Sequence, residues 1–165
     1  MYSEFTQVLL NLMSLVVSSL AGVATVYLAI QISYIRRIYL REAQATKMER
    51  TLQAVQLPPS VTKTMDEVVH LHAKGKLNLE VDSSLVASIR EALDCLETLA
   101  TGILADVYDE NIAYSRLGDS FIRFYDISRR FIYESRSNYS SASLYVQLDQ
   151  LERRWVSRER YSNKA

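Results

Sequence analysis

The amino-acid sequence predicts an all-α protein in which a single N-terminal transmembrane helix precedes a cytoplasmic helical bundle. The run Phe5–Tyr34 contains no charged residue. As a helix that rises about 1.5 Å per residue it reaches roughly 45 Å, which exceeds the ~30 Å of a bilayer core. The whole chain has only four glycines and two prolines, and an all-β fold of this length requires many more turn residues.

Three regions follow one another along the chain. Residues 1–35 form the predicted transmembrane anchor, residues 36–57 a juxtamembrane helical stalk, and residues 58–165 a helical cytoplasmic domain. The boundary between stalk and domain lies at the adjacent Pro58 and Pro59, because proline cannot continue the interior of a helix.

The flanking charges predict the orientation of the anchor. Arg36, Arg37 and Arg41 follow the apolar run, whereas no Lys or Arg precedes it. The positive-inside rule then places the N-terminus outside and the C-terminal domain in the cytoplasm. A cleaved signal peptide is the alternative. The missing positive charge before the run, and the continuation of the run to Ile32, favour an anchor.

Small residues recur on one face of the predicted anchor. Ser14, Ser18 and Gly22 are four residues apart, and such spacing allows two membrane helices to approach closely. We identify them as candidates for self-association into a homo-oligomer. The other interpretation is that this face contacts lipid only.

The stalk has a short heptad pattern. Ile38, Ala45 and Leu52 are seven residues apart, and no Gly or Pro occurs between Arg36 and Leu57. The transmembrane helix can therefore continue into the stalk. The apolar seam packs either against the following domain or against a second copy of the chain.

Apolar residues at helical spacing predict the elements of the cytoplasmic domain. Ser60 or Thr62 caps the first helix, Gly75 closes it, and residues 77–82 form an extended connection. Gly118 breaks or kinks the chain between the third and fourth helices. The predicted helices span about residues 60–72, 85–107, 110–117, 119–136 and 141–160.

Glu97 stands out in the leucine-rich second of these helices, at the edge of its apolar surface. We interpret it as a partly buried structural carboxylate that is hydrogen-bonded to a neighbouring helix. A catalytic role together with Asp106 or Asp109 is the alternative. For Asp109 and Glu110 we prefer stabilisation of a helix N-terminus to metal binding.

Arg153, Arg154 and Arg158 form a candidate basic contact patch near the C-terminus. Interleaved glutamates favour a solvated helix face over a nucleic-acid or lipid surface. Nineteen basic and nineteen acidic residues give a formal net charge of zero, so bulk charge provides no argument for nucleic acid as a partner.

No motif of the sequence indicates catalysis or a cofactor. A nucleophile elbow, a phosphate-binding glycine loop and a zinc-ligand spacing are all missing. His70 and His72 point to different faces of a helix, and the single cysteine, Cys95, cannot form an intrachain disulfide. We therefore expect a protein that is not an enzyme and needs no cofactor or metal.

Parts of the chain resemble a family of uncharacterised bacterial and prophage-encoded membrane proteins, in which one transmembrane helix precedes a helical domain of unknown function. The segments that carry the resemblance are KLNLE at 76–80, ALDCLETLATGILADVYDE at 92–110 and YVQLDQLERRW at 145–155. The resemblance implies this architecture and a bacterial inner membrane, but no established activity.

These observations lead to two functional hypotheses. The first is a non-enzymatic, membrane-anchored helical protein that binds a protein partner or itself. The family resemblance places it in phage–host conflict, such as abortive infection or superinfection exclusion. The second is a membrane-disrupting effector whose anchors self-associate and whose cytoplasmic domain gates them.

Overall fold

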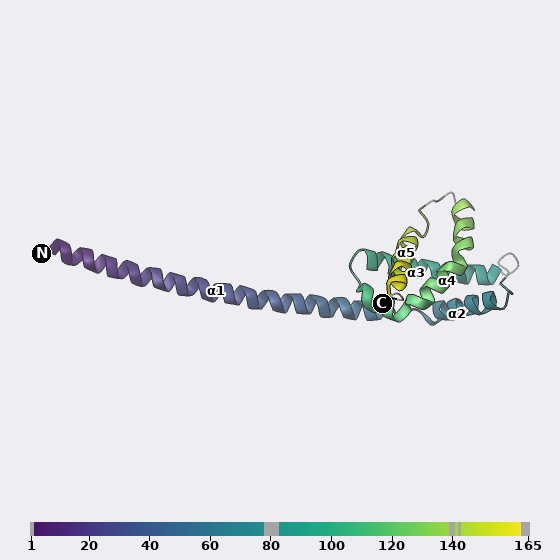
Figure 1. The fold of residues 1–165 in the computed structure, drawn as a ribbon, viewed down its shortest axis with the longest axis horizontal. Coiled ribbons are helices and arrows are strands. Elements are labelled where there is room, and N and C mark those ends of the chain that lie inside the picture. The colour runs from purple at the N-terminus through teal and green to yellow at the C-terminus, as the bar shows by residue number, and fades with distance from the viewer. Residues whose placement is uncertain (1, 78–82, 139–140, 142, 163–165) are drawn as a thin grey trace. The chain divides into compact units, whose positions relative to one another are not determined.

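A computed structural model describes the backbone of residues 2–77, 83–138, 141 and 143–162. Within these ranges the side chains of 2–12, 14, 16, 17, 21, 161 and 162 are not described. The described residues form five α-helices and no strand (Figure 1). The prediction of an all-α chain is confirmed. The predicted extended connection at 77–82 lies largely outside the described residues.

Helix α1 extends from Tyr2 to Ala54 without interruption (Figure 1). Its described part is long and apolar enough to cross a membrane, by length and composition. The absence of Gly and Pro from the stalk explains why the helix does not end after the apolar run.

The chain divides into two compact units, Met1–Ala45 and Thr46–Ala165. The last turns of α1 therefore belong to the second unit, although the sequence placed the start of the domain at Pro58. Thr51 is fully buried and Val55 belongs to the core. These two residues are four apart and lie on the same helix face.

Helix α2, Pro59–Ala73, begins and ends at residues with restricted backbones. Pro59 occupies the first turn, where its missing N–H costs nothing. The prediction of a Ser60 or Thr62 cap is wrong, because Pro58 is the N-cap and no side chain caps the helix. Gly75 has a φ of 63°. Its N–H and that of Lys76 donate to the carbonyls of His72 and Leu71, as in a Schellman motif.

Helix α3 runs from Ser83 to Leu104 and is followed by α4, Glu110–Asn138. The predicted separation into helices 110–117 and 119–136 is wrong, because α4 continues through Gly118. Gly118 is buried, and a Cβ atom there would lie 3.0 Å from Cδ2 of Tyr114. This glycine therefore makes room for an aromatic ring on the same helix.

Helix α5, Val146–Ser162, begins later than the predicted Ser141. Tyr145, the residue before it, has a φ of 58°. Such a left-handed backbone conformation cannot be part of an α-helix, so the helix starts only after this residue.

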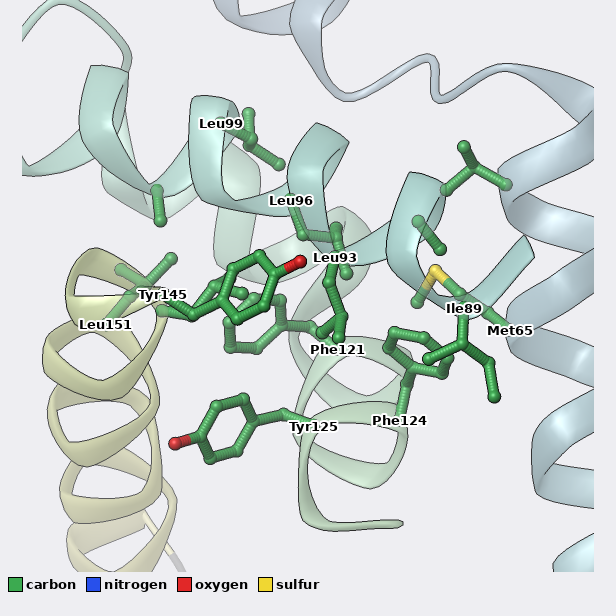
Figure 2. Packing of buried hydrophobic residues seen from close by; sticks show 14 of the residues in the cluster. Met65, Ile89, Leu93, Leu96, Leu99, Phe121, Phe124, Tyr125, Tyr145 and Leu151 are labelled. Carbon is green, nitrogen blue, oxygen red and sulfur yellow. The ribbon is translucent and has the colours of Figure 1, made fainter. Parts of the chain in front are cut away.

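The core of the second unit is built by all of its helices, with α3 and α4 at its centre. Helix α2 packs against α3 and α4, and so does α5. Figure 2 shows Met65, Ile89 and Phe124 at one end of this core and Tyr145 and Leu151 at the other. Trp155 is fully buried, with its ring centroid 4.9 Å from that of Phe121.

Candidate functional site

The candidate self-association face lies on the exposed part of α1. Ser18 and Gly22 are exposed, while the side chain of Ser14 lies outside the described residues. A Cβ atom at Gly22 would meet nothing within 4 Å, so no contact of the described chain requires a glycine there. A shallow apolar groove surrounds this position, lined by Ser19, Gly22, Val23, Val26, Tyr27 and Ile30.

Polar side chains of the apolar segment form hydrogen bonds within their own helix. The Ser19 hydroxyl donates to the Leu15 carbonyl at 2.9 Å, and Nε2 of Gln31 donates to the Tyr27 hydroxyl at 3.1 Å. Such internal bonds reduce the cost of placing these groups in a hydrocarbon environment.

Glu97 binds the N-terminus of α5 with both carboxylate oxygens. The backbone N–H of Gln147 donates to Oε1 at 3.1 Å, and that of Leu148 donates to Oε2 at 2.8 Å. Helix N-termini have unpaired N–H groups and a partial positive charge. The side chain therefore supplies from α3 a cap that α5 lacks in its own sequence.

A second contact joins α3 to the start of α5. The Tyr145 hydroxyl donates to Oδ1 of Asp94 at 2.9 Å. Burial, and then the hydrogen bond to Asp94, raise the pKa of Tyr145 above its usual value, so the hydroxyl keeps its proton at physiological pH. Asp94 and Glu97 are three residues apart on one face of α3, and together they fix the position of α5.

A polar groove of about 200 Å³ lies between α4 and α5. Arg136 spans it, donating to Oδ2 of Asp149 at 2.8 Å and to the carbonyls of Leu144 and Tyr145. The Tyr125 hydroxyl donates to Oδ1 of the same aspartate. Burial, followed by this hydrogen bond, raises the pKa of Tyr125. Both carboxylate oxygens of Asp149, on α5, thus accept hydrogen bonds from side chains of α4. Arg136 also binds the turn before α5.

The end of α1 is attached to the turn between α3 and α4. Asp109 uses its Oδ1 atom to cap α4, accepting from the N–H groups of Asn111 and Ile112, as the sequence predicts. Its own N–H donates to the Thr51 hydroxyl at 2.7 Å. One turn earlier on α1, Lys47 pairs with Asp106 at 2.5 Å. Asp106 has a φ of 60°, which is uncommon for a residue other than glycine.

The three arginines of the candidate basic patch have separate environments. Arg154 pairs with Glu110 at 2.9 Å, and the guanidinium of Arg158 lies 4.4 Å from the ring centroid of Tyr114. Arg153 lies beside the polar groove. Two of the three side chains therefore stabilise contacts between α4 and α5.

The histidines and the cysteine are not part of any metal-binding cluster among the described residues. His70 and His72 are exposed on α2. Burial, and then the nearby Glu91, raise the pKa of the Cys95 thiol, so this cysteine has little thiolate character.

The sequence did not indicate that Thr51, Arg136 and Asp149 hold different elements of the second unit together. Each has an ordinary place in a helical pattern, and its importance comes from a partner elsewhere in the chain. A polar residue at a position of the apolar periodicity is the only signal that the sequence offers, and Thr51 provides it beside Leu52 and Val55.

Comparison with known proteins found a match only at the level of the family. No curated protein and no solved structure matches the chain. Residues 16–155 match a family of uncharacterised function, and the match covers most of α1 and all of the core helices α2 to α4. The chain therefore belongs to the family described as Domain of unknown function (DUF4760).

Proposed function

We propose that the chain is a single-pass membrane protein whose cytoplasmic helical unit binds a protein partner without catalysing a reaction. The observation that carries the proposal is the exposed apolar surface of α1. Every described large apolar side chain of the first unit is exposed, for example Leu15, Val23 and Ile32 at 66–69%. So much apolar surface is stable in lipid but not in water.

The second unit supports the non-catalytic part of the proposal. Its conspicuous polar side chains, such as Glu97, Arg136 and Asp149, bind backbone groups or one another. These contacts fix the helices in place and use the lone pairs and protons that a catalytic site would offer to a substrate.

Membrane fractionation and two reporter fusions test the anchoring and the orientation in a bacterial host. We expect the full chain to resist carbonate extraction. A C-terminal green fluorescent protein should be bright, and a C-terminal alkaline phosphatase inactive, because the positive-inside rule places this end in the cytoplasm. Extraction of the chain into the soluble fraction would overturn the proposal, and an active phosphatase fusion would reverse the orientation.

Crosslinking in living cells tests the partner. A photoreactive residue at exposed positions of the second unit should give one discrete adduct of the full chain, and the adduct identifies the partner by mass spectrometry. If the setting is phage–host conflict, expression of the chain should lower the plating efficiency of at least one phage. Absence of any adduct across the exposed face would contradict the interaction role.

The groove around Gly22 favours a second candidate, the self-associating membrane-disrupting effector. No charged residue lies between Glu4 and Arg36, so a pore of such helices would have to be lined by hydroxyl groups and backbone. Induced expression with a membrane-potential dye separates the candidates. The interaction protein leaves the potential unchanged, whereas the effector depolarises the cell, and Gly22→Leu abolishes this effect.

A further inference from the structure

We infer that Arg36, Arg37 and Arg41 form an incomplete collar, a basic arc over one side of α1, that binds anionic lipid headgroups. The inference rests on the proposed membrane anchoring and names a class of lipid as a specific partner. All three side chains are exposed, and among the residues that the structure describes no carboxylate pairs with any of them. They are therefore available to an external anion.

Local charge supports an anionic partner. The sequence has no Asp or Glu between Glu4 and Glu42, so residues 36–42, directly after the apolar segment, carry three arginines and one glutamate and have a net charge of +2. Each basic residue near an anionic membrane surface contributes about 1 kcal/mol of attraction, which corresponds to about a fivefold preference. The planar guanidinium of arginine also matches the geometry of a phosphate group.

The distribution of the collar around the helix favours lipid over a protein surface. Successive helix positions differ by about 100°, so Arg37 lies about 100° from Arg36, and Arg41 about 140° from it. The three arginines therefore span an arc of about 140°, and Tyr34 and Tyr39, which are exposed as well, extend this arc to about 220° of the circumference. This arc is wider than the single stripe of a helix that a protein groove contacts, and a headgroup layer reaches all of it.

The height of the collar also fits a headgroup layer. From Tyr34 to Arg41 the helix rises about 10 Å, and the polar region of one leaflet is roughly 5–8 Å thick. Tyrosine is enriched at this level of membrane proteins. Arginine side chains bend along the helix toward phosphate, which covers the remaining difference.

Native mass spectrometry of the full chain in detergent tests the collar. The chain is offered equal amounts of phosphatidylglycerol and phosphatidylcholine, and the bound lipids are counted. We expect phosphatidylglycerol to be preferred, and Arg36→Gln/Arg37→Gln/Arg41→Gln to lower this preference by tenfold or more. Detergent removes any dependence of the result on how the variant inserts into a membrane.

A matched triple variant controls for total charge. Arg116, Arg123 and Arg160 are exposed in the second unit, and their replacement by glutamine should leave the lipid preference unchanged. Replacement of Arg36, Arg37 and Arg41 by lysine should keep most of the preference, which shows that the chain is intact. Equal loss in both glutamine variants, or no preference in the wild type, would overturn the collar.

The outcome is independent of the anchoring test. A chain that resists carbonate extraction but binds both lipids equally disproves the collar and leaves the anchor in place. A chain that is extracted by carbonate disproves the anchoring, whatever its lipid preference in detergent. An acidic protein that crosslinks to position 37, in a chain without lipid preference, would replace the lipid by a protein partner.

Discussion

The two units of the chain use similar residues in opposite ways. In Met1–Ala45 the described large apolar side chains are exposed, and the polar side chains of Ser19 and Gln31 form hydrogen bonds within their own helix. In Thr46–Ala165 the apolar side chains form a core, and polar side chains join helices that are distant in sequence. Helix α1 contributes to both units. Its described large apolar side chains are exposed in the first unit, whereas Thr51 is buried in the second unit, where other helices pack nearby.

The largest expected effect is a loss of unfolding free energy caused by a substitution in the core of the second unit. Phe121→Ala removes a fully buried ring that packs against Trp155, and should lower the free energy of unfolding by about 3–5 kcal/mol. Tyr133→Ala, at an exposed position of the same helix, should change it by less than about 0.5 kcal/mol. Urea unfolding of the full chain in detergent, followed by fluorescence of the single tryptophan, measures both.

The next largest expected effect is a loss of membrane integration by the first unit, with the fold of the second unit unchanged. An arginine at the centre of a membrane helix costs about 2.5–3.5 kcal/mol, so Leu20→Arg, at the exposed midpoint of the apolar run, should reduce membrane integration about 100-fold. Val107→Arg introduces the same side chain at an exposed valine of the second unit and should leave integration unchanged. Carbonate extraction compares the two variants. Equal integration of both would show that the exposed apolar surface of α1 does not reside in lipid.

A smaller effect concerns the contact between α3 and α5. Glu97→Gln keeps the size of the side chain but replaces one acceptor by an N–H donor that faces the helix N-terminus. We expect a loss of about 1–3 kcal/mol in unfolding free energy, with α5 exchanging its amide hydrogens faster. Glu159→Gln, on the exposed face of α5, is the control. If both variants unfold alike, Glu97 does not hold α5.

The smallest expected effect concerns the contact between Lys47, at the start of the second unit, and Asp106, in the turn before α4. Asp106→Ala loses the ion pair with Lys47, whose carboxylate partner is exposed, and retains the left-handed backbone, so the unfolding free energy should fall by about 0.5–1 kcal/mol. Asp106→Gly loses the same ion pair but removes the cost of that backbone conformation, and should remain within about 0.5 kcal/mol of the wild type. Identical midpoints for the two variants in urea would mean that residue 106 does not adopt this conformation in solution.

Local signals in the sequence predicted local structure well. Gly75 at the end of α2 and Asp109 at the start of α4 act within one turn of the backbone, and both predictions are confirmed. Helical periodicity also predicted the all-α class, because it reports which face of a helix is apolar. It does not report which helix covers that face.

The errors arise where the decisive contact is not in the local pattern. Glycine is a common helix breaker, but Gly118 is buried inside α4, where the Tyr114 ring leaves little room for a side chain. The hydrogen bond between Thr51 and Asp109 joins residues 58 positions apart, and no spacing rule connects them. The left-handed backbone of Tyr145 delays the start of α5, and its hydroxyl is bound by Asp94, 51 positions earlier in the chain.

The two glycines of the second unit that lie within α-helices have a consequence for how the family can vary. A Cβ atom at Gly102 would lie 2.2 Å from Cε2 of Tyr108, which is a clash, whereas one at Gly118 would lie 3.0 Å from Cδ2 of Tyr114, which is a tight contact. In each case a tyrosine four or six positions away occupies the space of the missing side chain. Alanine would favour the helix by about 1 kcal/mol at either position, but the tyrosine ring must then move aside or be replaced by a smaller side chain. The two residues of each pair are therefore expected to change together, and a homologue that loses one tyrosine should also lose its glycine.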